Sequence, residues 1–417
     1  MTNLRIDRRA LLAGASVLST AWLAQRAGAS VSAWTTPALF PQDSGRTLIL
    51  LQLAGGNDGL DTVVPWGDDA YHSARPSLAL RKNEILALDD YRGFHSGLKQ
   101  LRRHFDAGRV ALIEGAGYPE PIRSHFRSFD VWHTADHRGR SAGDGWVGRL
   151  CDVACKDTQN PNLVVHVGGS VPYSLHSATH PPASFVNPRA YRWAGGEAET
   201  DAYEKAGGME PEEREKKPKK REGESSLDFL RRVLADGQQS SEQVRRAVAN
   251  YRTPVDYPAN EALAQSLADV AALVSGGIGT RVISIEMGGF DTHTDERNRH
   301  DQLMRTLDSA LGPFLDDLAR SEAGRKAMVV VFSEFGRRVA ENGARGTDHG
   351  VAGPMFVLGH ELKGGLYGKH PSLEKLDDGD LVHTTDFRSV YATAIERCFG
   401  VKHDKVLGAK YPLLPFA

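Results

Sequence analysis

The sequence predicts an α/β fold in which a mostly parallel central sheet is sandwiched by helices. Short, nearly continuous apolar runs recur along the chain, and this pattern is typical of strands buried on both faces of a parallel sheet. The runs lie at 46–54, 109–116, 162–168, 281–287, 327–334 and 354–359, and helical periodicity lies around 225–249, 259–275, 297–320 and 385–398. Strands and helices that alternate in this way indicate an α/β sandwich.

The first 29 residues have the pattern of a cleavable export signal. They contain paired arginines (Arg8 and Arg9), a short apolar stretch and a small-residue site at 27–29, which together are typical of a twin-arginine signal peptide. The apolar stretch is too short to span a membrane stably. We therefore expect export by the twin-arginine machinery and a periplasmic or secreted protein.

We expect residues 30–417 to form a single domain that carries one insertion. Residues 195–226 consist almost entirely of charged residues and glycine, with no apolar periodicity. Such a segment cannot bury enough apolar surface to order itself, so it should form an exposed insertion. Because the alternation of strands and helices resumes after it, it is not a linker between independent domains.

Composition argues against several classes of protein. The formal charge of −2 provides no basic footprint for nucleic acid. The three cysteines have no clustered spacing, and no G-x-G-x-x-G follows a strand, which argues against a redox enzyme. Cys151 and Cys155 stand four residues apart in a helical pattern, a poor geometry for a disulfide unless the helix ends there, so their pairing stays open.

Acidic and imidazole side chains gather where the predicted strands end. In sheets of this kind, ligands bind at the carboxyl ends of the strands. Two of the loops share one form, a strand followed by Gly-Gly, one residue and Asp, and glycine there lets the backbone turn sharply. The residues concerned are Asp58 after the first run, Asp291 and His293 after 281–287, Glu334 at the end of 327–334, and Asp348 and His349 before 354–359.

Each of these residues, taken alone, has an ordinary structural interpretation. Asp58 could cap a helix, and a lone His349 could be a hydrogen-bonded structural histidine. Several acidic segments on one rim are harder to explain in this way, because their charges repel one another unless a cation relieves the repulsion. A mixed set of imidazoles and carboxylates suits Zn²⁺, Mn²⁺ or Fe better than Ca²⁺ or Mg²⁺, and Zn²⁺ or Mn²⁺ is favoured. We therefore expect one or two divalent metal ions.

Three further residues near this rim receive separate interpretations. We expect Asp295 and Glu296 to face solvent at the start of a helix, where acidic side chains complement the helix dipole. His300 lies on the same predicted helix, and the sequence leaves open whether it binds metal or serves the structure.

Ser124 stands at the start of the helix predicted after the 109–116 run. A serine in this place is most often the N-cap of the helix. Beside a metal, however, it could be activated as a nucleophile. Arg123 and Arg337 are the arginines best placed to neutralise the oxygens of an anionic ester.

Six blocks of the sequence carry a resemblance to a known family. They are LQLAGGNDGLDTVVP, RSHFRSFDVWHTAD, GGFDTHTDERNRHDQLM, VVVFSEFGRR, GTDHGVAGPMFVLG and TDFRSVYATAIERCFG, and they span residues 46 to about 415. Together they resemble, in family order, the bacterial family catalogued as domain of unknown function 1501. That family is similar in turn to the alkaline phosphatase-like superfamily of sulfatases, phosphatases and phosphomutases.

The resemblance to the superfamily implies roles for individual residues. It implies that Asp58 is the metal ligand after the first strand and that Ser124 is the nucleophile. It also implies that Asp291 with His293 forms the middle metal block, and that His349 is the last histidine ligand.

The sequence departs from the superfamily pattern at two places. Where an adjacent Asp-His pair is usual, it reads SEFG, so either Glu334 ligates alone or Asp348 and His349 supply the pair. The segment RSHFR lacks the C/S-x-P-x-R context that formylglycine sulfatases require, which disfavours a sulfatase of that kind.

The sequence therefore predicts an exported metal-dependent hydrolase of phosphate or related sulfate or phosphonate esters. Ser124 or a metal-bound water would be the nucleophile, and the substrate would be a small anionic ester or a polymer. The alternative is a catalytically degenerate binding or assembly protein of the cell envelope, which keeps the fold while the departure at Glu334 has weakened the metal site.

Overall fold

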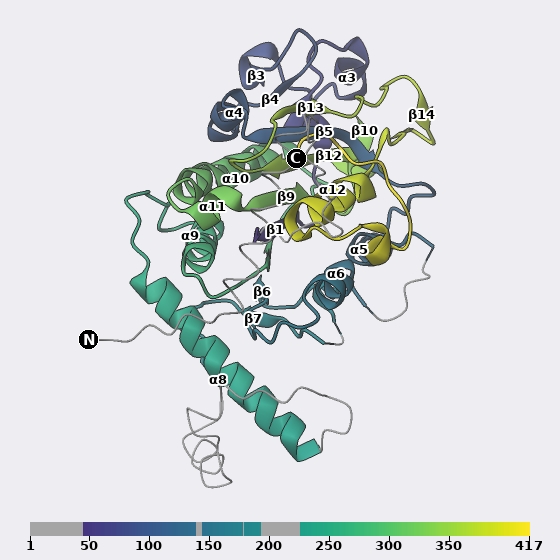
Figure 1. The fold of residues 1–417 in the computed structure, drawn as a ribbon. Coiled ribbons are helices and arrows are strands. Elements are labelled where there is room, and N and C mark those ends of the chain that lie inside the picture. Colours follow the sequence, from purple (N-terminus) through teal and green to yellow (C-terminus); the bar gives the residue numbers. More distant parts are fainter. Residues whose placement is uncertain (1–44, 139–143, 178, 193–225) are drawn as a thin grey trace, which may run out of the picture. The chain divides into compact units, whose positions relative to one another are not determined.

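A nine-stranded sheet forms the centre of the protein (Figure 1). The computed structural model describes residues 45–138, 144–177, 179–192 and 226–417. Along the sheet the strands follow the order β13-β5-β12-β9-β1-β8-β6-β7, and β16 pairs with β5. The bounds are β1 (Leu48–Leu53), β5 (Val110–Gly117), β6 (Val164–Val167), β7 (Ala183–Phe185), β8 (Val282–Met287), β9 (Met328–Phe332), β12 (Gly353–Leu358), β13 (Gly365–Tyr367) and β16 (Thr385–Asp386).

The sheet is parallel except at β12. This strand runs antiparallel to both of its neighbours, β5 and β9, whereas the other neighbouring pairs in the sheet are parallel. Its sequence has the same apolar pattern as the parallel strands because residues 355–358 are also buried within the sheet. The predicted fold class, a mostly parallel sheet sandwiched by helices, is confirmed.

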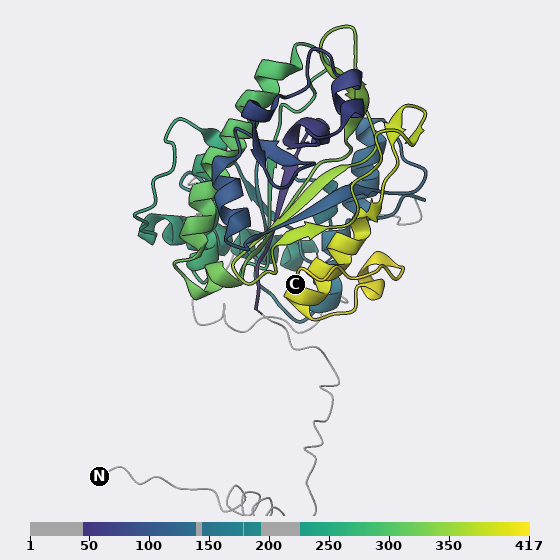
Figure 2. The same ribbon diagram turned by 90° about the horizontal axis from the view of Figure 1, so that it is seen from above.

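Helices cover both faces of the sheet (Figures 1 and 2). Alternate residues of β1 enter two separate cores, Ile49 and Leu51 on one face and Leu48 and Leu50 on the other. The first face is covered by α4 (Lys99–Asp106), α8 (Ser226–Asn250), α9 (Ala262–Ser275) and α10 (Glu296–Leu318), and the second by α5 (His125–Thr134), α6 (Trp146–Ala154) and α12 (Phe387–Phe399). Each fully buried aliphatic side chain stabilises this arrangement by about 1.5–3 kcal/mol.

Short elements complete the described part of the chain (Figure 1). A three-stranded sheet has the order β2-β4-β3, and two further pairs join β10 to β11 and β14 to β15. The bounds are α2 (Gly59–Thr62), β2 (Val63–Val64), α3 (Asp69–Ala74), η1 (Lys82–Glu84), β3 (Ile85–Ala87), β4 (Gly93–His95), η2 (Tyr173–Leu175), α11 (Glu322–Lys326), β10 (Arg337–Glu341), β11 (Thr347–His349), β14 (Leu376–Asp377), β15 (Asp380–Leu381) and α13 (Asp404–Leu407).

A fully buried arginine ties several of these short elements together. The Nη1 atom of Arg75, which follows α3, lies 2.5 Å from the Oδ2 atom of Asp58 and 2.9 Å from the Oδ1 atom of Asp61. Its other nitrogens donate to the backbone carbonyl oxygens of Arg338 and Val339 in β10, each at 2.9 Å. The guanidinium therefore fixes the position of α2 relative to α3 and β10.

Several predictions concern the ends of the chain and its surface. The predicted signal peptide, residues 1–29, and residues 195–225 of the predicted insertion lie outside the described residues, and Ser226 begins α8.

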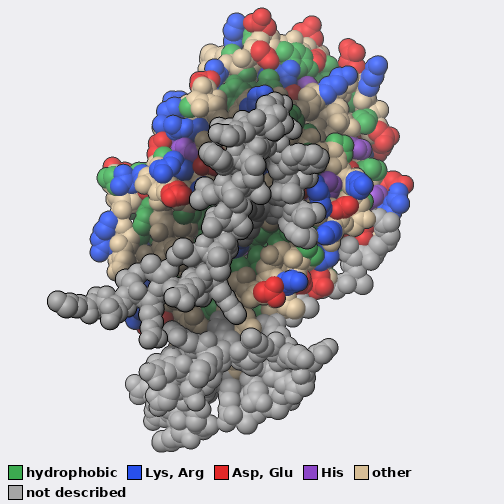
Figure 3. Space-filling view, viewed as in Figure 1, with side chains coloured by type: hydrophobic (Ala, Val, Ile, Leu, Met, Phe, Trp, Pro, Cys, Tyr) green, Lys and Arg blue, Asp and Glu red, His purple; other side chains and the backbone are tan. Residues whose placement is uncertain are grey.

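Cys151, Cys155 and Cys398 form no disulfide with one another. On the face in Figure 3, basic and acidic side chains are interspersed over the described surface. Within the described residues, no helix is long and apolar enough to cross a membrane.

We expect Arg75→Met to destabilise the protein by about 3–5 kcal/mol, because it leaves two buried carboxylates without their cation. Chemical denaturation measures this change. Arg246→Met is the matched control, since Arg246 forms an exposed ion pair with Glu242 one helical turn away, and it should cost at most about 0.5 kcal/mol. Equal losses of stability in the two variants would contradict the structural role of Arg75.

Candidate metal centre

Three histidines and one aspartate converge at the carboxyl ends of the central strands. His125 is the first residue of α5, Asp291 and His293 follow β8, and His349 ends β11. The Oδ1 atom of Asp291 lies 3.1 Å from Nε2 of His293, 3.2 Å from Nε2 of His349 and 3.7 Å from Nε2 of His125. The Nε2 atoms of His293 and His349 are 2.9 Å apart. We call these four residues the HHHD cluster.

Each imidazole of the HHHD cluster has an oxygen acceptor at its other nitrogen. The Nδ1 atom of His125 lies 2.8 Å from Oε1 of Glu334, and that of His293 lies 3.3 Å from Oδ1 of Asp348. The Nδ1 atom of His349 lies 2.9 Å from a backbone carbonyl oxygen. An oxygen at this distance accepts the Nδ1 proton. The Nε2 atom of each ring therefore keeps its lone pair, which faces the other ligand atoms of the HHHD cluster.

This donor set fits a divalent metal ion. Four electron pairs that face one another without a cation would repel, whereas a metal turns the same arrangement into a favourable one. In a tetrahedral zinc site with bonds of about 2.0–2.2 Å, ligand atoms lie roughly 3.3–3.6 Å apart. The four separations given above, from 2.9 to 3.7 Å, bracket these values, and ligand atoms of His125, Asp291 and His349 all lie within 4.8 Å of one another. Imidazole and carboxylate ligands suit Zn²⁺ or Mn²⁺.

Arg337 holds the carboxylate of the cluster in place. Its Nη2 atom lies 2.8 Å from Oδ1 of Asp291, and its guanidinium also donates to the carbonyl oxygens of Gly55, Gly56, Phe290 and Thr347. Partial burial raises the pKa of Asp291, but hydrogen bonds from Arg337 and His349 and the charges of Arg337 and His293 together outweigh it and lower this pKa to about 2. Because Arg337 is fully buried behind Asp291, it positions the carboxylate and does not reach a substrate, contrary to the role predicted for it.

The two Gly-Gly loops run against each other beneath the cluster. Gly55 has a φ of +121°, and a Cβ atom there would lie 2.4 Å from the backbone nitrogen of Asp291. The amide of Gly55 donates to Oε1 of Glu334 at 2.9 Å. Glycine is therefore required at 55 because the backbone of the second loop approaches so closely.

Asp58 does not join the HHHD cluster, contrary to the ligand role predicted for it. Its carboxylate is buried, pairs with Arg75 and accepts from the backbone amides of Leu60 and Asp61. It therefore caps α2, which is the ordinary structural interpretation of an aspartate in this place.

Glu334 and Asp348 do not belong to the HHHD cluster either. Their oxygens contact the Nδ1 atoms of His125 and His293, on the side of each ring that faces away from the cluster. Both carboxylates were predicted as metal ligands. The structure gives them the role of holding the ligand histidines, which is common around metal sites.

Ser124 and Arg123 flank the cluster at the start of α5. The side chain of Ser124 is exposed and does not cap the helix. The guanidinium of Arg123 pairs with Asp378 at 2.8 Å and Asp380 at 2.5 Å, and its carbonyl oxygen accepts from His349. Arg123 is thus engaged in structural contacts, whereas the hydroxyl of Ser124 faces solvent beside a ligand candidate.

His125 was not predicted as a ligand. The sequence places it beside Ser124 at a helix start, but its partner Glu334 lies 209 residues away. Sequence spacing cannot reveal a contact of this separation. Its place in the sequence was a usable signal. The first residue of a helix that follows a strand lies at the carboxyl edge of the sheet, where the other candidate ligands also lie.

Glu296 and His300 are buried on α10 behind the cluster. Glu296 was expected to face solvent, but the β10–β11 segment covers the first turn of α10, and Thr347 donates to Oε2 of Glu296 at 2.7 Å. Burial and then the charges of Asp58 and Asp61 raise the pKa of Glu296 to about 9. His300 lies 3.4 Å from oxygens of Asn57 and Thr62 and not in the HHHD cluster, and its pKa is lowered by burial to about 3.

The raised pKa of Glu296 predicts how stability depends on pH. Its folded pKa of about 9 exceeds the ordinary value of 4.5, so the folded state keeps a proton that the unfolded state loses. The free energy of unfolding should therefore fall as the pH rises from about 5 to 9. In Glu296→Gln this contribution should be absent, so the variant gains stability relative to the native chain as the pH rises.

Denaturation in chelating buffer at pH 5.5, 7 and 9 measures the effect. Asp295→Asn is the matched control, because Asp295 is exposed with a φ of +43° that asparagine tolerates. Parallel pH profiles for the native chain and Glu296→Gln would show that Glu296 is ionised in the folded protein.

Comparisons with known proteins place the chain in a family. The model of the family described as "Protein of unknown function (DUF1501)" matches residues 111–409. No curated protein matches the sequence. Among solved structures, a protein of the alkaline phosphatase superfamily from Vibrio parahaemolyticus is 9% identical, with a TM-score of 0.39, over 89% of this chain and 72% of its own.

Two further solved structures are similar at the same level. The C-terminal periplasmic domain of EcEptC from Escherichia coli, in a complex with Zn, is 10% identical with a TM-score of 0.40, over 87% of this chain and 85% of its own. The lipoteichoic acid synthase LtaP from Listeria monocytogenes is 10% identical with a TM-score of 0.35, over 93% and 81%. The family match spans all four residues of the HHHD cluster, and the chain belongs to the DUF1501 family of proteins of unknown function.

Proposed function

We propose that this protein is an exported, metal-dependent hydrolase of phosphate esters or of related sulfate or phosphonate esters. The observation that carries the proposal is that the Nε2 atoms of three histidines lie 3.1–3.7 Å from one carboxylate oxygen in the HHHD cluster. One divalent metal held by these atoms, Zn²⁺ or Mn²⁺, would supply Lewis-acid activation of an ester oxygen. Residues 30–417 would form the mature, periplasmic or secreted enzyme.

The residues around the cluster have complementary roles in this proposal. Ser124 supplies the nucleophilic hydroxyl, or positions a water that attacks in its place. The start of α5 attracts the anionic group of the substrate, because a helix N-terminus carries partial positive charge. Glu334 and Asp348 keep the rings of His125 and His293 in the orientation that metal binding needs.

The exposure of the cluster supports a large substrate as well as a small one. The side chains of Asp291 and His293 are 48% and 41% exposed, and Phe126, next to His125, is 84% exposed. A centre that lies open to solvent can accept an ester on a polymer, which a closed pocket would exclude. Phe126 offers an apolar surface beside the reacting group.

The function test combines metal content with hydrolysis. The purified chain should bind one Zn²⁺ or Mn²⁺ and hydrolyse 4-nitrophenyl phosphate or bis(4-nitrophenyl) phosphate. His349→Ala should lose the metal and the activity together. Ser124→Ala should keep the metal and lose about 100-fold or more in kcat, because a nucleophile acts only in the chemical step.

The possible outcomes of this test separate the alternatives. Full activity in Ser124→Ala, with its loss in His349→Ala, would identify water as the nucleophile. A chain that binds no metal, whose melting temperature does not respond to added Zn²⁺ or Mn²⁺, and that is inactive would contradict the proposal, since a ligand that binds only the folded state must stabilise it. That result would favour the binding or assembly protein.

We expect Glu334→Gln to weaken metal binding about 10- to 100-fold, because the amide no longer fixes the proton on Nδ1 of His125. A competition titration with a chromophoric chelator measures the affinity. Asp295→Asn changes an exposed carboxylate on the same rim that pairs with Arg345 and should leave the affinity unchanged. The role of Glu334 is disproved if both variants bind metal as tightly as the native chain.

A further inference from the structure

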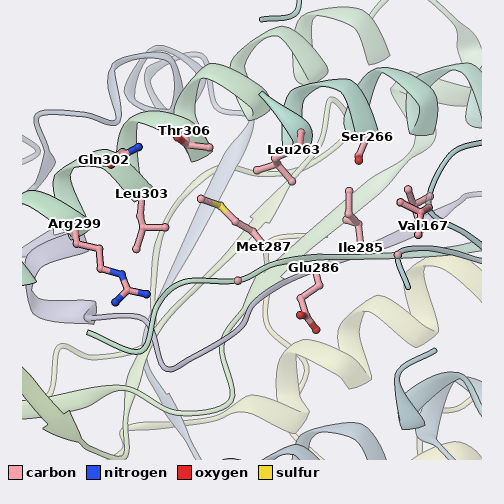
Figure 4. A pocket seen from close by; sticks show the side chains of 14 residues that line it. Val167, Leu263, Ser266, Ile285, Glu286, Met287, Arg299, Gln302, Leu303 and Thr306 are labelled. Atoms are coloured by element: carbon pink, nitrogen blue, oxygen red, sulfur yellow. The ribbon is translucent and has the colours of Figure 1, made fainter. Parts of the chain in front are cut away.

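A second feature of the strand-end rim is a pocket between β8 and the helices α9 and α10 (Figure 4). It encloses about 520 Å³, within the range of small-molecule sites. Leu263 and Ser266 of α9 face Ile285 and Met287 of β8 across it. The HHHD cluster contributes none of the residues that line it.

The walls of the pocket are aliphatic. Its apolar lining consists of Val167, Val186, Ala262, Leu263, Ile285, Met287 and Leu303, and no aromatic side chain is among the lining residues. A sugar or a base usually stacks on an aromatic ring, so these walls suit neither. They suit an alkyl or acyl chain, whose transfer from water contributes about 0.8 kcal/mol for each buried methylene.

One end of the pocket carries an unpaired cation. Arg299 on α10 is exposed, and its guanidinium makes no hydrogen bond or ion pair with any residue that the structure describes. Neighbouring arginines of α10 are engaged, Arg297 with Glu84 and Arg305 with Asp301. Gln302 and Thr306 follow Arg299 along the same helix and line the pocket with it (Figure 4).

The one carboxylate of the lining does not neutralise this cation. Glu286 is turned to the opposite side of β8 from Ile285 and Met287 (Figure 4), as the alternation of a strand requires. Burial and then the negative charge of Glu334 raise the pKa of Glu286. Within the described residues Glu286 forms no ion pair with Arg299, so the guanidinium is available to an anion.

The pocket and the candidate metal centre share one rim. Gly288 lines the pocket, and Asp291 follows it by three residues. Consecutive Cα atoms lie about 3.8 Å apart, so the two Cα atoms are at most about 11 Å apart.

We propose that this pocket binds an anionic amphiphile, with an aliphatic chain between α9 and β8 and a phosphate or carboxylate head group at Arg299. Burial of the chain provides the affinity, and the arginine selects the sign and position of the head group. The inference goes beyond the proposed hydrolase function, because binding here does not require the metal centre.

Calorimetric titration with octyl phosphate, below its micelle concentration, tests the proposal. Octyl phosphate should bind at one site, while inorganic phosphate and octyltrimethylammonium should bind at least tenfold more weakly. Arg299→Gln should weaken octyl phosphate about tenfold or more, since it removes a charge-assisted hydrogen bond. Ser266→Phe should abolish binding by filling the pocket, and Arg305→Gln is the matched control on the same helix.

The proposal is overturned if octyl phosphate does not bind the native chain, if octyltrimethylammonium binds as tightly, or if Arg299→Gln and Ser266→Phe bind like the control. The same titration on His349→Ala separates this proposal from the hydrolase. Unchanged binding there shows that the pocket is independent of the metal centre. Loss of binding in folded His349→Ala would contradict the pocket as an independent site.

Discussion

The buried guanidinium of Arg337 is the interaction on which the strand-end rim depends. It joins the loop after β1 to the loop after β8 and to the start of β11 through four carbonyl oxygens. A buried arginine is tolerated only when its donors are satisfied, so these loops must keep their mutual positions. Asp291 receives the fifth hydrogen bond of Arg337. The guanidinium that holds these loops together therefore also positions the carboxylate of the HHHD cluster.

A layer of oxygen acceptors behind the cluster fixes its imidazoles. The acceptors are Glu334, Asp348 and the carbonyl oxygen of Arg123. Glu334 is buried and also accepts from the amide of Gly55, so it cannot reach the ligand atoms of the HHHD cluster. Its part is to orient His125, which brings an imidazole from the opposite side of the rim.

Much of this arrangement could be predicted from the sequence, because the apolar runs fix the strands and parallel strands end on one rim. That geometry places Asp291 and His293 on the rim, whereas His349 lies there because β12, the strand that follows it, runs antiparallel. The prediction for Asp58 failed because its partner, Arg75, lies in a segment without a motif. Glu296 follows the helix-start pattern of an exposed acid, but Thr347 from β11 covers it. Contacts of this kind join different segments of the chain, so no local sequence pattern predicts them.

X-ray absorption spectroscopy of the zinc-loaded chain tests the HHHD centre most directly. The first shell should contain about four nitrogen and oxygen scatterers at about 2.0–2.1 Å, with the outer-shell signature of three imidazoles. His125→Ala should remove one imidazole from this signal, since His125 is the ligand that only the structure indicates. A zinc shell without imidazole, or one that His125→Ala leaves unaltered, would contradict the account.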